Sequence, residues 1–133
     1  MSGTLIGASE RTPGLEQTPS QQPFLTIVTP AYNEAENLPV LYQRLRAVLD
    51  SLDTDWEWIV VDDHSTDGTF EVLTHLAGED DRLRGFRFSR NFGSHMAITC
   101  GLNHARGDCA IVMAADLQDP PEVILKLIEK WKE

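Results

Sequence analysis

The sequence lacks several features that would place it in a common class. It has only two cysteines, Cys100 and Cys109, and their spacing fits neither a disulfide framework nor a zinc site, so we expect two reduced thiols. No apolar run reaches the roughly 18 to 20 residues that cross a membrane. The first residues also lack the charged and then apolar pattern of a secretory signal. These absences predict a cytoplasmic protein.

Basic residues are also scarce. The chain has 11 Lys and Arg against 21 Asp and Glu, a formal net charge of -10, and no block rich in Lys or Arg occurs. Proteins that track a nucleic acid backbone need such a block, so nucleic acid is not expected as a partner. A GxGxxG fingerprint is absent after the first predicted strand, which argues against a dinucleotide-dependent dehydrogenase.

The chain does contain enough apolar material for one domain. Hydrophobic residues make up 41% of its 133 residues, which suits a single compact α/β domain. Residues 1–23 are rich in Ser, Thr, Gln, Gly and Pro, a composition that does not offset its own ordering entropy. We therefore expect a flexible tail over residues 1–23 and a folded domain over residues 24–133.

Within this domain, apolar runs alternate with stretches of helical periodicity. Four runs predict buried strands: FLTIVTP at 24–30, WEWIVVDD at 56–63, LRGFRFS at 83–89 and DCAIVMAA at 108–115. Each is followed by a predicted helix, the first of which should begin with Asn37 as its N-cap. Four consecutive βα units predict a Rossmann-like parallel sheet with helices on both faces.

A polar cluster follows every predicted strand: TPAYNEAEN, DDHSTDG, SRNFGS and ADLQD. The carboxyl ends of parallel strands meet at one edge of the sheet, where ligands bind near a topological switch point. Loops are polar in general, so the evidence is the convergence of four unusual clusters on one edge. We expect one binding site there.

The last cluster contains oxygen ligands suited to a metal ion. Asp119 and Glu122, with two prolines between them, resemble a helix start with a capping box. This leaves Asp116 and Gln118, which point the same way if the segment is extended and can present two oxygens to one hard cation. A Mg²⁺ or Mn²⁺ ion held by only these two oxygens would need further ligands, from water and from a bound substrate, to complete its octahedron.

The segments TPAYNEAENLP, VVDDHSTDGT, SRNFG and ADLQDPPE together resemble glycosyltransferase family 2, in the nucleotide-sugar-binding half of its GT-A fold. DLQDPPE and SRNFG are similar in particular to the polyprenyl-phosphate glycosyltransferases, relatives of dolichol-phosphate mannose synthase. The resemblance implies metal-assisted, inverting transfer of a sugar from a nucleotide diphosphate sugar to a polyprenyl phosphate or another glycan acceptor. It also implies a location at the cytoplasmic face of the membrane.

The same resemblance implies a site drawn from all four segments. The implied nucleotide-sugar-binding residues are Pro30, Ala31, Tyr32, Glu34, Asp62, Asp63, Arg90, Ala115 and Asp116, and the implied metal ligands are Asp116 and Gln118. The adjacent carboxylates of Asp62 and Asp63 repel each other, so the pair costs stability unless something binds it. Asp63 is expected to face the base, and Arg90, close to a helix N-terminus, suits a phosphate.

Simpler interpretations stand beside these. Asp62 and Asp63 could be solvated loop acids, Tyr32 a packing aromatic and Arg90 a surface residue, while Asp67 is best explained as a turn residue before a helix.

The chain departs from the family pattern in two places. Ala114 stands where the family usually has the first acid of an Asp-x-Asp motif. The last predicted helix reaches the chain end, whereas the resembling enzymes continue through an acceptor-binding half, so a truncated donor-binding portion is expected. No catalytic residue is assigned, because a lipid phosphate acceptor is already anionic.

These departures leave two alternative functions. The first is a non-catalytic nucleotide-binding remnant. The second, a receiver-like signalling domain, is less favoured because its acid pair should follow the first strand.

Overall fold

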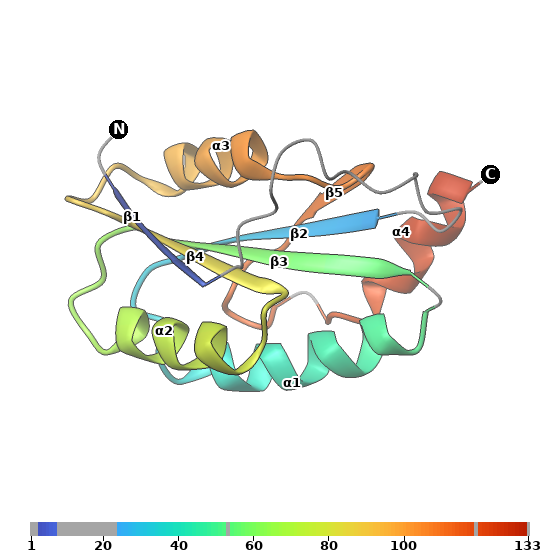
Figure 1. The fold of residues 1–133 in the computed structure, drawn as a ribbon, viewed down its shortest axis with the longest axis horizontal. Helices are drawn as coiled ribbons and strands as arrows, with labels where there is room; N and C mark the ends of the chain where they lie inside the picture. Colours follow the sequence, from blue (N-terminus) through green and yellow to red (C-terminus); the bar gives the residue numbers. More distant parts are fainter. Residues whose placement is uncertain (1–2, 8–23, 53, 119, 133) are drawn as a thin grey trace.

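The computed structural model describes residues 3–7, 24–52, 54–118 and 120–132. It confirms the predicted alternation of strands and helices (Figure 1). In chain order the elements are β1 (Gly3–Gly7), β2 (Phe24–Ala31), α1 (Asn37–Asp50), β3 (Asp55–Asp62), α2 (Thr69–Glu79), β4 (Leu83–Phe88), α3 (Ser94–His104), β5 (Cys109–Val112) and α4 (Val123–Lys132). No helix in these ranges is both long enough and apolar enough to cross a membrane.

One strand lies where the sequence suggested a flexible tail. β1 pairs with β4 in the antiparallel sense, with Gly3 opposite Phe88 and Gly7 opposite Arg84. Its backbone N–H and C=O groups thereby cover an edge of β4 that would otherwise be open. The expectation of flexibility therefore fails for these five residues, and the rest of that segment lies outside the described residues.

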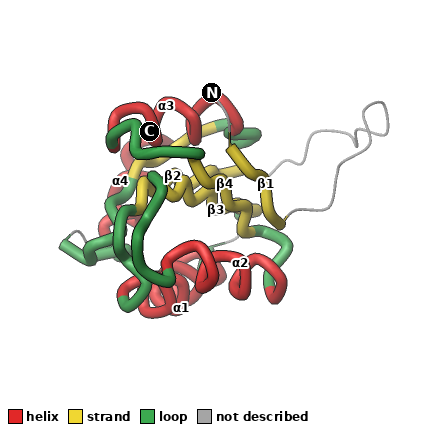
Figure 2. The backbone as a smooth tube through the Cα atoms, turned by 90° about the vertical axis from the view of Figure 1, so that its left-hand side faces the viewer, coloured by secondary structure: helices red, strands yellow, loops and turns green. Residues whose placement is uncertain are grey.

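The strand order is β1-β4-β3-β2-β5. β2 pairs in parallel with β3 on one side and with β5 on the other, so the chain builds outward to β4 and then returns to the far side of β2. This reversal of direction is a topological switch point, where open α/β sheets bind ligands. α3 covers one face of the sheet while α1 and α2 cover the other, as predicted (Figure 2).

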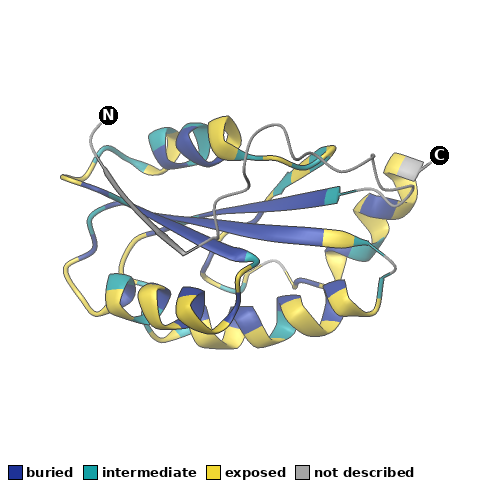
Figure 3. Ribbon diagram, in the orientation of Figure 1, coloured by how far each residue is buried: buried dark blue, intermediate teal, exposed yellow. Residues whose placement is uncertain are grey.

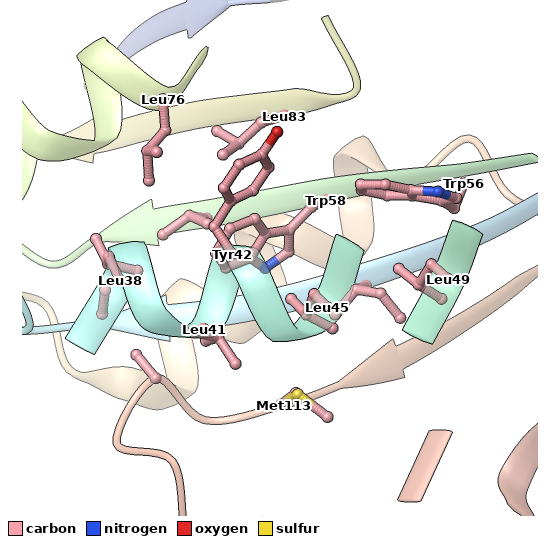
Figure 4. Close-up of a cluster of buried hydrophobic side chains, with 14 of the residues drawn as sticks. Leu38, Leu41, Tyr42, Leu45, Leu49, Trp56, Trp58, Leu76, Leu83 and Met113 are labelled. Carbon is pink, nitrogen blue, oxygen red and sulfur yellow. The ribbon is translucent and has the colours of Figure 1, made fainter. Parts of the chain in front are cut away.

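Coverage on both faces explains why the central strands are mostly apolar. In β3 every residue except Asp55 is buried, and β2 and β3 are almost entirely buried in Figure 3. The larger core lies between the sheet and α1 (Figure 4), where the Tyr42 and Trp58 rings stack with centroids 6.4 Å apart. Trp58 is fully buried and donates its indole N–H to Thr29 Oγ1 at 2.9 Å. The polar residues at the strand ends therefore extend from strands that are held by a well-packed core.

α3 lies unusually close to the other face. A Cβ atom placed on Gly101 would lie 2.3 Å from Val28 Cγ1, which means that glycine lets the helix approach β2 directly. Phe86, Phe88 and Ile59 fill the rest of this interface. The seating of α3 fixes its first residue, Ser94, at the carboxyl edge of the sheet.

Candidate active site

A pocket of about 240 Å³ lies at the carboxyl edge of the sheet, at the switch point. Four segments that are distant in the sequence form its wall: the end of β2 and the following loop, the residue after β3, the first residue of α3, and the loop after β5. The lining residues are Pro30, Ala31, Tyr32, Glu34, Asp63, Ser94, Ala114, Ala115 and Asp116. The predicted convergence of strand-end segments on one site is therefore observed.

Most of the residues implied by the resemblance lie in this wall; Asp62, Arg90 and Gln118 do not. Arg90 is exposed, and its guanidinium carbon lies 4.6 Å from the centroid of the Phe92 ring. Ser94 and Ala114 were not predicted to line the pocket. Both residues lie in segments that the sequence places at this edge: Ser94 ends the SRNFGS cluster, and Ala114 directly precedes the predicted Ala115.

Asp63 connects the end of β3 to the start of α3. It is 4% exposed, and its two carboxylate oxygens accept hydrogen bonds from the backbone N–H groups of Phe92 at 2.7 Å and Gly93 at 2.9 Å. Gly93 has φ of 97°, a conformation that favours glycine. The carboxylate that was expected to face the base therefore holds the turn before α3, and each oxygen keeps a further lone pair for a ligand.

Asp62 points to the opposite side of β3. It is fully buried, and its Oδ1 accepts hydrogen bonds from the backbone N–H of Ser65 at 3.0 Å and from the Ser65 hydroxyl. Its Oδ2 lies 3.7 Å from Arg87 Nε. Successive side chains of a strand alternate between faces, so Asp62 stabilises the loop after β3 while Asp63 reaches the pocket.

Two loops of the pocket edge are hydrogen-bonded to each other. The backbone N–H of Glu34 donates to Thr69 Oγ1 at 2.9 Å, and that of Ala35 donates to Asp67 Oδ2 at 3.4 Å. Burial raises the pKa of the Asp67 carboxyl, but the hydrogen bonds from Thr69 and Ala35 together outweigh burial and lower this pKa overall. Asp67 also accepts from the N–H of Thr69, the first residue of α2, which confirms its interpretation as a residue of the turn before a helix.

Glu34 is held in place by the residue that was expected to cap α1. Asn37 Nδ2 donates to Glu34 Oε2 at 2.7 Å. The N-cap position is occupied by Glu36 and not by Asn37, so the predicted cap is wrong by one residue. Asn37 instead orients a carboxylate of the pocket wall.

The loop after β5 does not have the expected extended shape. Leu117 has φ of 64°, which is rare for a bulky residue, and the N–H of Gln118 donates to Asp116 Oδ1 at 3.1 Å. The premise that Asp116 and Gln118 point the same way along a strand is therefore wrong. Asp116 is exposed on the pocket wall, whereas Gln118 is exposed outside it. Asp119, the predicted helix cap, lies outside the described residues, and Glu122 pairs with Arg44 at 3.1 Å.

The chemistry of the loop suits a hard cation. Asp116 and Gln118 supply oxygen donors, the ligand type that Mg²⁺ and Mn²⁺ prefer. The described part of the chain contains no group of three or more His, Cys, Asp or Glu side chains that could hold a metal by themselves. The residues present therefore fit a metal that draws its other ligands from a bound diphosphate and water.

Comparison with known proteins supports the resemblance that the sequence motifs indicated. Glycosyl transferase family 2 matches residues 26–133. An uncharacterized glycosyltransferase of Bacillus subtilis, YkcC, is 46% identical over 108 residues, which are 81% of this chain and 33% of the relative. An undecaprenyl-phosphate 4-deoxy-4-formamido-L-arabinose transferase of Shewanella sediminis is 41% identical over 83% of this chain and 34% of its own length. The chain thus spans about a third of the length of these relatives.

Solved structures show the same fold. The mannosyltransferase PcManGT from Pyrobaculum calidifontis, in complex with GDP-Man and Mn²⁺, matches 92% of this chain and 36% of its own with a TM-score of 0.64 and 28% identity. Residues 1–349 of TarS from S. aureus match 79% of this chain and 31% of their own with a TM-score of 0.60 and 21% identity, a likeness of fold. These neighbours are GT-A glycosyltransferases, which confirms the predicted fold class. The chain belongs to glycosyl transferase family 2.

Proposed function

We propose that the pocket binds the nucleotide of a nucleotide diphosphate sugar and that the chain serves sugar transfer to a polyprenyl phosphate. The observation that carries the proposal is the convergence of Pro30, Tyr32, Asp63 and Asp116 on one pocket at the switch point of the sheet. In this assignment Tyr32, which is 45% exposed at the rim, packs against the base or ribose. Glu34 and Asp63 offer oxygens to ring N–H and hydroxyl groups.

Asp116, on the pocket wall, is the residue that would hold a divalent metal, and Gln118, in the same loop but outside the wall, is the second oxygen donor that the resemblance implies. Once bound, Mg²⁺ or Mn²⁺ would neutralise the charge that develops on the departing nucleoside diphosphate. The mannosyltransferase PcManGT was solved with GDP-Man and Mn²⁺, which supports this choice of ligand and cation. Ser94, the first residue of α3, lines the same pocket, and a helix N-terminus suits an anionic diphosphate.

The proposed acceptor follows from relatives that are named as undecaprenyl-phosphate sugar transferases. The oxygen of a lipid phosphate is anionic at neutral pH and can attack the anomeric carbon from the face opposite the leaving diphosphate. The sugar would thus be transferred with inversion and without a strong base from the protein. A polyprenyl acceptor would place the reaction at the cytoplasmic face of a membrane.

Calorimetric titration with UDP and with GDP tests the donor site. Each nucleotide is added at fixed salt in the presence of Mn²⁺ and then of EDTA, to the wild type and to Asp116→Ala. Glu129→Ala removes an exposed carboxylate from α4 and serves as the matched control. We expect metal-dependent binding of one nucleotide that is lost in Asp116→Ala and unchanged in Glu129→Ala; no binding of either nucleotide by the wild type would refute the proposal.

A second candidate function is nucleotide binding without transfer, which is favoured by Ala114 at the pocket wall, because the resembling enzymes usually have an acid at this position. Incubation with a nucleotide diphosphate sugar and polyprenyl phosphate separates the two. Formation of a lipid-linked sugar supports the transferase, whereas binding with no product supports the second candidate.

A further inference from the structure

Asn33 occupies an unusual position between two residues of the pocket wall. Tyr32 and Glu34 both line the pocket, whereas Asn33 does not. Its φ is 55°, in the left-handed region that asparagine tolerates better than other residues with a Cβ atom. The left-handed turn directs its side chain toward the loop that follows β3.

The side chain of Asn33 is a hub of hydrogen bonds across the two loops. Its Oδ1 accepts from the backbone N–H of Thr66 at 2.9 Å, the backbone N–H of Asp67 at 3.3 Å and the Thr66 hydroxyl at 3.3 Å. In return, the backbone N–H of Asn33 donates to Ser65 Oγ at 2.8 Å. The same serine is held by the buried Asp62. The contacts therefore run from a fully buried carboxylate through Ser65 to the backbone at the pocket rim.

We propose that Asn33 is a positioning residue that fastens the Tyr32–Glu34 segment to the loop at 64–68 and so fixes the nucleotide pocket before ligand binds. This inference rests on the proposed function for its effect on binding. We call the hydrogen bonds of Asn33 with Ser65, Thr66 and Asp67 the clamp. These bonds do not depend on any ligand. Loss of the clamp lets the two loops separate, and the apparent affinity falls with the fraction of molecules that keep the pocket formed.

Asn33 contributes both a side-chain hydrogen-bond acceptor and tolerance of a positive φ, and substitutions can test these two properties separately. Asn33→Gly keeps the left-handed backbone accessible but removes the acceptor. Asn33→Asp keeps both an acceptor and tolerance of positive φ. Asn103→Ala, at an exposed position of α3, is the control for the loss of an asparagine side chain far from these loops.

Amide hydrogen exchange, followed residue by residue by NMR on the ligand-free chain, is the direct test of the clamp. We expect faster exchange at the Thr66 and Asp67 amides by about tenfold or more in Asn33→Gly, since two backbone hydrogen bonds are lost. Protection at these amides should remain in Asn33→Asp and Asn103→Ala. Unchanged exchange at both amides in Asn33→Gly would overturn the clamp.

The effect on the pocket is measured as the dissociation constant of whichever nucleotide the wild type binds with Mn²⁺. We expect Asn33→Gly to bind about tenfold more weakly, with no change at Asn103→Ala, and urea unfolding should show that Asn33→Gly is still folded under the binding conditions. Weakened protection with binding within twofold of the wild type would refute the positioning role. Failure of the wild type to bind would refute the proposed function instead, while the exchange experiment would still decide whether the clamp exists.

Discussion

α3 packs closely on the sheet, and the space around a glycine decides whether its replacement by alanine raises or lowers the free energy of unfolding. Gly101 and Gly78 are both glycines within helices, on α3 and α2. A Cβ atom at Gly101 would lie 2.3 Å from Val28 Cγ1, whereas a Cβ atom at Gly78 would meet nothing within 4 Å. The same change to alanine should therefore have opposite effects at the two positions.

The magnitudes follow from two competing contributions. Replacing a glycine in a helix by alanine stabilises the helix by about 0.5–1 kcal/mol. At Gly101 this gain meets a clash with Val28, whose side chain is fully buried and stiff because it is β-branched, and overpacking of this kind costs about 1–3 kcal/mol. We expect Gly101→Ala to lower the free energy of unfolding by about 1–2 kcal/mol. Gly78→Ala, near the end of α2, should raise it by about 0.5 kcal/mol.

Equilibrium unfolding in urea measures both changes, provided that the slope with denaturant is the same for the three proteins. Because α3 carries Ser94 into the pocket, Gly101→Ala should also weaken nucleotide binding, while Gly78→Ala should leave it unchanged. A Gly101→Ala protein that is as stable as the wild type would show that α3 does not lie against Val28 as described, and the position of Ser94 would then lose its support.

Three further predictions concern substitutions that remove or add a carboxylate. Asp80 accepts hydrogen bonds from Arg82 and from Tyr42. Burial raises the pKa of Asp80, but these hydrogen bonds outweigh burial and lower the pKa from 3.8 to about 2. The lowered pKa contributes about 2 kcal/mol to the free energy of unfolding, which is present above pH 3.8 and is lost as the pH falls toward 2. The difference in unfolding free energy between wild type and Asp80→Asn should therefore shrink between pH 7 and pH 2.5, and a constant difference would contradict this. Glu57→Ala should cost about 3–5 kcal/mol in urea unfolding, since it leaves the buried Arg84, 2.8 Å away, without its carboxylate; a loss below 1 kcal/mol would show that the pair is solvated. Ala114→Asp should tighten Mn²⁺-dependent nucleotide binding several-fold by adding an oxygen donor to the pocket wall, and equal affinities in calorimetry would argue against a metal at this loop.

Periodicity and turn chemistry were sufficient to predict the framework of the fold. Strands buried on both faces are mostly apolar, as β2 and β3 are, and α1 shows its buried positions at helical spacing. The site followed from the same logic, because polar residues at the ends of parallel strands must share an edge. β1 was not predictable in this way, since its pairing depends on the open edge of β4, which is set by the tertiary fold and not by the segment itself.

Local backbone conformation limited the assignment of individual roles. Leu117 adopts a positive φ although leucine disfavours it, and its side chain packs against the main core. Packing thus determines the turn that sets Asp116 on the pocket wall, and no propensity of the residue indicates it. Asn33, by contrast, is a residue type that suits a positive φ, so a turn there is consistent with the sequence, although its partners across the loop are not.

The two adjacent acids show how much further strand alternation could have carried the prediction. Along β3, Trp58 and Val60 pack on the side of α1, and Ile59 and Val61 pack on the side of α3. Continuing this alternation places Asp62 on the α1 side and Asp63 on the α3 side, where its oxygens meet the turn before α3. Electrostatic repulsion gives Asp62 and Asp63 the same role, whereas the alternation of side chains along the strand places them on opposite faces of the sheet. The buried acid supports the loop that Asn33 binds, and the other acid holds the start of α3, so the pair stabilises the pocket from both faces of the sheet.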